Sequence, residues 1–167
     1  MIHVYTGNGK GKTTAALGLA LRAAGNGLKV YIGQFLKGRA YGELRALKKF
    51  KNIKIEQFGS VCFVGKKPSQ KDVELAKKGL EKSRKILSKK IYDLVVLDEI
   101  NVALRLGLLD LEEVLAMIRK IPKKTELVLT GRYAPKKIIK AADLVSEIKE
   151  IKHYFKKGVK CRRGIEF

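Results

Sequence analysis

The chain has 167 residues, of which 46% are hydrophobic, and it carries a formal net charge of +21. This length and composition predict one ordered domain with its own core and exclude a disordered chain. The longest apolar stretch, Ala15 to Leu21, excludes a membrane-spanning helix, because such a helix needs about 20 apolar residues.

The first predicted elements are a strand, a glycine-rich loop and a helix. The strand is Ile2–Thr6, the helix ends near Gly25, and the loop between them reads Gly7-Asn8-Gly9-Lys10-Gly11-Lys12-Thr13-Thr14. Small residues let successive backbone N–H groups turn toward an anion, and a helix N-terminus adds about half a positive charge. Lys12 can reach the outer phosphates, and the Thr13 hydroxyl can hold Mg²⁺. The loop predicts a nucleoside triphosphate site, although Thr6 stands where the usual pattern has its first glycine.

Apolar, β-branched runs alternate with helical patterns along the rest of the chain. This alternation predicts an α/β fold with a mostly parallel sheet and helices on both faces. The predicted strands are Ile2–Thr6, Leu28–Phe35, Ile53–Phe58, Leu94–Asp98, Glu126–Thr130 and Leu144–Ile148.

Capping patterns mark the later helices. Ser69 with Asp72, and Asp110 with Glu113, each resemble a capping box at the start of a helix. Pro135 suits the first turn of a last helix that runs to about Ala142. The chain after Lys149 is basic and less regular, and we expect it to lie across the surface of the same domain.

Polar side chains follow several predicted strands at their carboxyl ends, which is where sheets of this kind bind ligands. The apolar run that ends in Asp98 and Glu99 has the form of a Walker B element, so Thr13, Asp98 and Glu99 are the predicted magnesium ligands. Arg132 is a predicted clamp for phosphate charge, since its planar guanidinium matches phosphate oxygens. A surface arginine is the alternative. We expect the strand-end residues to contribute to cofactor binding; they are Gln34, Lys37, Asn101 and Arg132.

The loop from Gly59 to Gly65 is apolar where loops are normally polar. It holds Val61, Phe63 and Val64 between turn residues. Two interpretations remain open: the loop packs into the core, or it covers a flat hydrophobic ligand.

The positive charge has two explanations, a nucleic-acid footprint or a lysine-coated surface. Lysines number 28 and arginines nine, whereas base recognition favours arginine, and the basic segments lack a series of stacking aromatics. We therefore expect no specific nucleic-acid partner. Two lone cysteines, Cys62 and Cys161, suit a reducing cytosol. Met1 leads directly into the first strand, so we expect no signal peptide and a cytoplasmic location.

Together these motifs resemble the P-loop ATP:corrinoid adenosyltransferases, from one end of the chain to the other. The resemblance implies a P-loop NTPase (RecA-like) fold, with residues 1–167 forming one nucleotide-binding domain that ends in a basic segment from about residue 149. It also implies a homodimer. The segments that carry it are Gly7 to Thr14, Gln34 to Gly38, Val95 to Glu99, Leu129 to Arg132, Ala142 to Glu147, Lys152-His153 with Phe155, and Gly164 to Phe167.

Members of that family transfer the 5′-deoxyadenosyl group of ATP to the Co(I) centre of a corrinoid and release inorganic triphosphate. The resemblance implies that Gly7 to Thr14 holds ATP with Mg²⁺ or Mn²⁺, and that Lys12 and Arg132 neutralise the leaving group. Phe63 would displace the lower axial ligand of the corrinoid, so that a donor such as a reduced flavoprotein can reduce the cobalt. Some members carry an N-terminal extension and a tryptophan in the apolar loop, and this chain has neither.

Two other functions share the phosphate loop and the acidic strand end. One is a RecA-like ATPase acting on nucleic acid, which the positive charge supports, and the other is a small-molecule kinase. Neither has a use for the apolar loop.

Overall fold

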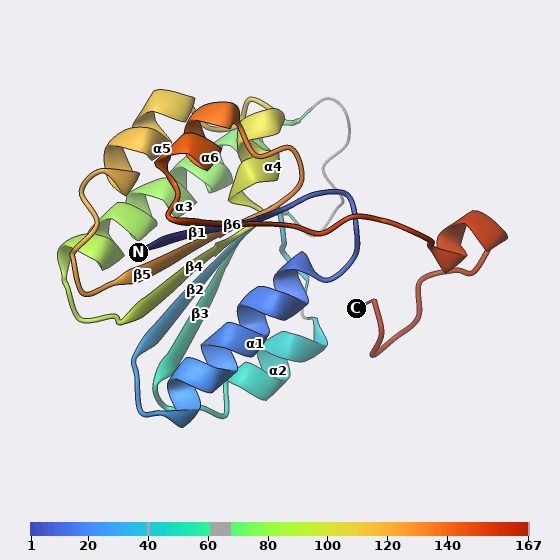
Figure 1. Ribbon diagram of the computed structural model, residues 1–167, viewed down its shortest axis with the longest axis horizontal. Coiled ribbons are helices and arrows are strands. Elements are labelled where there is room, and N and C mark those ends of the chain that lie inside the picture. The colour runs from blue at the N-terminus through green and yellow to red at the C-terminus, as the bar shows by residue number, and fades with distance from the viewer. Residues whose placement is uncertain (40, 61–67, 167) are drawn as a thin grey trace.

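The computed structural model describes residues 1–39, 41–60 and 68–166 and contains one six-stranded sheet (Figure 1). The strands lie in the order β3-β2-β4-β5-β1-β6, and each neighbouring pair is parallel. The predicted α/β sheet is confirmed, and its described strands are all parallel rather than mostly so. Their bounds are β1 Ile2–Thr6, β2 Val30–Phe35, β3 Ile53–Phe58, β4 Leu94–Asp98, β5 Glu126–Thr130 and β6 Leu144–Glu147.

Two strands are shorter than the sequence predicted. β2 begins at Val30 rather than Leu28, because the Lys29 backbone N–H donates to the Asp93 side chain, at Oδ2 and 2.8 Å, and not to the backbone of a neighbouring strand. β6 ends at Glu147 rather than Ile148, whose carbonyl leaves the ladder and accepts from the Gly9 backbone N–H at 2.7 Å. Both corrections are at strand ends, where one backbone group of the residue bonds outside the sheet.

Helices cover both faces of the sheet (Figure 1). One face carries α1 and α2, and the opposite face carries α3 to α6. The sequence did not predict α2 and α4, because six residues are too few to show a helical period and neither helix has a side-chain cap at its start. The helices are α1 Lys12–Gly25, α2 Gly42–Leu47, α3 Gln70–Ser88, α4 Ile100–Arg105, α5 Leu111–Ile118, α6 Lys136–Ala141 and the 3₁₀ helix η1 Tyr154–Lys157.

The predicted helix starts are confirmed with two corrections. Ser69 and Asp72 form both bonds of a capping box at α3. Asp110 caps α5 by accepting from the Glu113 backbone N–H at 3.0 Å, but the Glu113 carboxylate lies 3.5 Å from Arg84, so only half of that box forms. Pro135 is extended, with ψ 143°, and therefore precedes α6 instead of lying in its first turn.

The central strands β2, β4 and β5 are buried on both sides, because each side faces a layer of helices. Within β4, Leu94 and Val96 belong to the core beneath α1, whereas Val95 and Leu97 belong to the core beneath α3 and α5. Because helices cover both faces of these strands, polar side chains that bind ligands are expected at the carboxyl ends of the strands. No helix in the described part of the chain is long and apolar enough to cross a membrane.

Candidate active site

The phosphate loop lies between β1 and α1 and packs against the chain that leaves β6. The Gly9 N–H donates to Ile148 O at 2.7 Å. A Cβ on Gly9 would lie 2.7 Å from Lys149 O, and a Cβ on Gly7, whose φ is +94°, would lie 2.4 Å from Ile148 O. Glycine is therefore required at both positions, by close approach of backbone to backbone.

Two cationic side chains meet at this loop. Lys12 is only 7% exposed, and its ammonium donates to Gly9 O at 2.6 Å. The Arg132 guanidinium reaches the same loop from beyond β5 and donates to Asn8 O at 3.3 Å. Burial, and then the charge of Arg132, lower the pKa of Lys12 from its ordinary value. The structure thus brings together three of the predicted site residues, Lys12, Arg132 and Asn8.

The Asp98 carboxylate lies at the centre of the polar side chains that gather at the carboxyl ends of the strands, and it is fully buried. Its Oδ1 accepts from the Thr13 hydroxyl at 2.9 Å and from the Thr130 hydroxyl at 2.7 Å. Its Oδ2 accepts from the Lys37 ammonium at 2.8 Å and from the Gln34 amide at 3.3 Å. Although burial opposes its charge, Lys37 keeps a raised pKa because Asp98 lies beside it. Four donors, from α1, from β5, from β2 and from the loop after β2, therefore fix this carboxylate.

Glu99 follows in a left-handed conformation, with φ +62°, at the start of α4. Its backbone N–H donates to the Thr130 hydroxyl at 3.0 Å, while its carboxylate accepts no hydrogen bond from the described residues. Burial, and then the charge of Asp98, raise the pKa of Glu99; Lys37, Lys12 and Arg132 act in the opposite direction. The Glu99 carboxylate is thus close enough to Lys37, Lys12 and Arg132 to feel their charge, and its oxygens are available to bind a metal ion.

Magnesium would find oxygen donors here, on Thr13 and Glu99. No group of three or more His, Cys, Asp or Glu side chains suited to a metal occurs in the described ranges. That donor set fits Mg²⁺, because Mg²⁺ is normally held by one or two protein oxygens, substrate phosphates and water.

Asn101 is fully buried in α4, yet neither its amide oxygen nor its amide nitrogen has a partner within the described ranges. The backbone of Gly131, with φ +128°, lies against it, and a Cβ on Gly131 would be 3.1 Å from Asn101 Cβ. A buried amide without partners is costly, so this side chain is equipped to bind a polar group.

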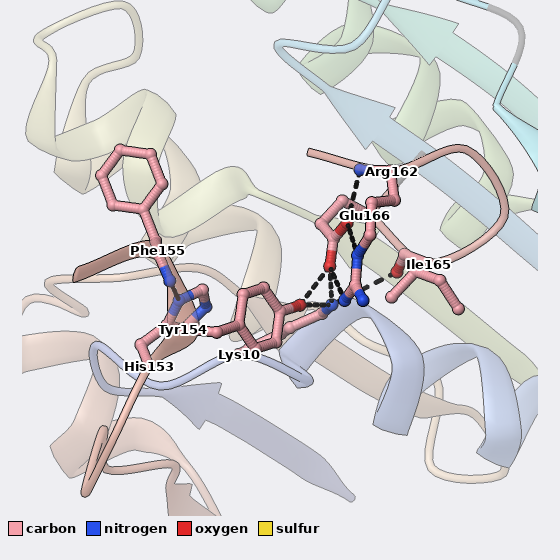
Figure 2. Close-up of polar contacts among 7 residues, drawn as sticks. All are labelled: Lys10, His153, Tyr154, Phe155, Arg162, Ile165 and Glu166. Atoms are coloured by element: carbon pink, nitrogen blue, oxygen red, sulfur yellow. Dashed lines mark hydrogen bonds and ion pairs between the residues drawn. The ribbon is translucent and has the colours of Figure 1, made fainter. Parts of the chain in front are cut away.

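The remaining predicted residues have different surroundings. Lys10 lies within the loop, but its ammonium donates to Tyr154 and Glu166 of the C-terminal segment (Figure 2). Thr14 lies on the exposed side of α1, and Gly11, with φ +117°, caps that helix. Phe63 lies outside the described residues.

Three residues of this region were not predicted as site residues. Thr130 was included only in a motif, and its role in fixing Asp98 depends on β5 lying beside β4. Tyr154 and Glu166 bond to Lys10 from the far end of the chain. No local sequence pattern indicated Tyr154, which is a tyrosine in a basic segment. Glu166 could have been indicated, because it is the acidic residue of the motif from Gly164 to Phe167 that the sequence analysis had singled out.

Comparison with known proteins agrees with this geometry. The family described as ATP:corrinoid adenosyltransferase BtuR/CobO/CobP matches residues 1–167. A corrinoid adenosyltransferase of Pseudomonas aeruginosa is 39% identical over 166 residues, which cover 98% of this chain and 82% of that protein. That of Escherichia coli K12 is 34% identical over 167 residues, covering 100% and 85%.

Among solved structures, a KaiC-like protein from Pyrococcus horikoshii superposes with a TM-score of 0.58 and 20% identity, covering 90% of this chain and 74% of that one. This likeness supports the predicted RecA-like P-loop fold alone. The family match over the whole chain, with relatives at 34% and 39% identity, shows that the chain belongs to the ATP:corrinoid adenosyltransferase family.

Proposed function

We propose that this chain transfers the 5′-deoxyadenosyl group of ATP to the Co(I) centre of a corrinoid. The cobalt electron pair forms the Co–C bond, the bond from C5′ to oxygen breaks, and triphosphate leaves with that bond's electrons. The observation that carries the proposal is the convergence of Lys12 and Arg132 on a glycine-rich loop beside the Asp98 cluster. Family membership supports the choice of substrates.

The chain has to position and neutralise rather than to abstract a proton, because Co(I) is itself a strong nucleophile. The N–H groups of Gly7 to Thr14 would cradle the triphosphate, with Lys12 and Arg132 placed against the charge that develops on it. Asp98 already accepts four hydrogen bonds and is unsuited to act as a base. Because both carboxylate oxygens of Asp98 are hydrogen-bonded, the arrangement supports a site that acts by stabilising charge and not by transferring a proton.

Mg²⁺, or Mn²⁺ in its place, would be held by the Thr13 hydroxyl and the Glu99 carboxylate and would supply further neutralisation of phosphate charge. Asp98 was predicted as a ligand too. We propose that it acts through Thr13, whose hydroxyl proton it accepts, leaving the Thr13 lone pairs for the ion.

The second substrate would approach the same edge. Asn101 is proposed to contact substrate through its unpartnered amide, while Gln34 and Lys37 shape the site through their bonds to Asp98. From the family resemblance we also propose Phe63 as the group that displaces the lower axial ligand, a reduced flavoprotein as electron donor, a cytosolic location and a homodimer.

The fate of ATP tests the function. ³¹P NMR of a reaction with chemically reduced corrinoid should show one inorganic triphosphate for each adenosylated product, and Lys12→Ala should show neither. ADP accumulating in step with product would overturn the proposal. ATP turnover that requires nucleic acid would favour the RecA-like ATPase, which the match of the whole chain to the transferase family disfavours.

A further inference from the structure

The C-terminal segment folds back onto the phosphate loop. Beyond β6 the chain leads away from the sheet to η1 and then returns toward α1 (Figure 1). The return brings Glu166 to Lys10, which lies 156 residues earlier in the chain and within the phosphate loop. Nothing in the transfer reaction described above uses this contact.

The Lys10 ammonium has three acceptors, all from the C-terminal segment (Figure 2). It donates to Tyr154 Oη at 2.7 Å, to Glu166 Oε1 at 2.8 Å and to Ile165 O at 3.3 Å. An ammonium has three protons, so these bonds use its full donor capacity. Lys10 is thus engaged by the end of the chain.

The acceptors are themselves fixed. Glu166 Oε2 accepts from the Arg162 backbone N–H at 2.6 Å, and Glu166 Oε1 accepts from the Tyr154 hydroxyl. The Arg162 guanidinium lies 4.8 Å from the centroid of the Tyr154 ring. His153 caps η1 by accepting from the Phe155 backbone N–H at 3.1 Å. Lys10 first, then Tyr154 and Arg162, hold the pKa of Glu166 well below its ordinary value, so the carboxylate is charged at neutral pH.

The two lysines of the loop therefore differ in their electrostatic state. Lys12 is bonded to a neutral carbonyl, Gly9 O, and keeps its charge available. Lys10 is paired with a carboxylate. Immediately before Lys10, the Gly9 N–H donates to Ile148 O, so the chain after β6 holds the loop at two adjacent residues. A phosphate cradle benefits from bracing, because fixed N–H groups cost no reordering when the anion binds.

We propose that Glu166 is a positioning residue for ATP: through Lys10 it holds the phosphate loop in the shape that binds triphosphate. Lys10 then serves as the anchor of the C-terminal segment rather than as a phosphate contact. This inference rests on the proposed binding of ATP at the loop and adds a residue that contacts no substrate.

A double-mutant cycle tests the inference through ATP binding alone. Calorimetry with MgATP and no corrinoid would compare wild type, Lys10→Met, Glu166→Gln and the double variant. Each single change should weaken ATP binding about fivefold, and the double variant should bind no more weakly than Lys10→Met, since both changes break the Lys10–Glu166 pair. In the transfer reaction KM for ATP should rise while kcat at saturating ATP stays near the wild-type value.

The matched control is Glu81→Gln, which removes the same charge from an exposed pair with Lys85 on α3. It should leave ATP binding unchanged. Wild-type affinity in Glu166→Gln would overturn the inference, and so would losses that add up in the double variant, because Lys10 and Glu166 would then act on ATP independently of each other. A wild-type protein that fails to bind ATP would instead refute the proposed function.

Discussion

The Thr13 hydroxyl donates a 2.9 Å hydrogen bond to Asp98 Oδ1 and so joins the first turn of α1 to the end of β4. The Thr130 hydroxyl donates to the same oxygen from β5, the strand between β4 and β1. The loop and the acidic strand end are thereby coupled across the sheet by hydrogen bonds with definite directions. With its proton given to Asp98, Thr13 presents only lone pairs to a cation.

Replacing Thr13 by valine should affect both stability and metal use. Asp98 would lose one of the donors to its buried Oδ1, and we expect the free energy of unfolding to fall by about 1–2 kcal/mol. The Mg²⁺ concentration that half-saturates transfer should rise. Thr14→Val, at an exposed position of the same helical turn, should leave the unfolding free energy unchanged. A Thr13→Val protein with the wild-type Mg²⁺ requirement would remove Thr13 from the proposed metal site.

Lys12→Ala should abolish most transfer without loss of the fold. Removing one donor to developing charge lowers kcat by about 100- to 1000-fold. Stability should hold, because a buried ammonium is costly and the Lys12 pKa is already lowered by burial. Kinetics and thermal melts check both expectations, with Lys77→Ala on the exposed face of α3 as the control. Activity within about tenfold of wild type would contradict the assignment, since it leaves less than 1.4 kcal/mol to Lys12.

The strands were predictable because they are apolar runs bounded by turn residues, and five of six begin where the sequence indicates. The phosphate loop and the pair Asp98 and Glu99 were predictable because each is a local motif. The contacts that organise the site could not be predicted from the sequence. Lys37 reaches Asp98 across 61 positions and Lys10 reaches Glu166 across 156, and no local pattern encodes which strand lies beside which or where a tail returns.

Nucleic-acid binding should be weak and unspecific. Dispersed lysines would release counterions on binding, so any affinity should fall steeply as salt increases. Titrations of labelled duplexes of unrelated sequence at several salt concentrations measure this. Sequence-selective binding at about 0.15 M salt would contradict the expectation and revive the nucleic-acid ATPase.

Phe63→Ala should separate cobalt reduction from alkyl transfer. The proposed task of Phe63 is to displace the lower axial ligand, which makes Co(II) easier to reduce. The variant should therefore lose far more activity when the reaction starts from Co(II) corrinoid and a mild reductant than when it starts from preformed Co(I). Equal losses in the two assays would assign Phe63 to ordinary packing.

Glu99→Gln should make the protein more stable and less active. Burial, followed by the charge of Asp98, raises the pKa of Glu99 above its ordinary value of 4.5, so the folded state binds its proton more tightly than the unfolded state does. The stabilising contribution of Glu99 is then complete below pH 4.5 and is lost as the pH rises through the raised pKa. Above the raised pKa the wild type holds an ionised, half-buried carboxylate, and a neutral amide of the same shape avoids that cost.

Thermal melts of the two proteins from pH 4 to pH 8 measure the difference. The advantage of Glu99→Gln in melting temperature should be largest at the highest pH and should shrink as the pH falls through the raised pKa of Glu99. In the same variant, transfer should need more Mg²⁺ than in wild type, and excess metal should partly restore the rate, because an amide oxygen is a weaker ligand than a carboxylate. A variant that stays inactive at saturating Mg²⁺ would show that Glu99 does something other than hold metal. A melting temperature at pH 7 below that of wild type would show that the loop cations outweigh burial and Asp98 at this carboxyl group.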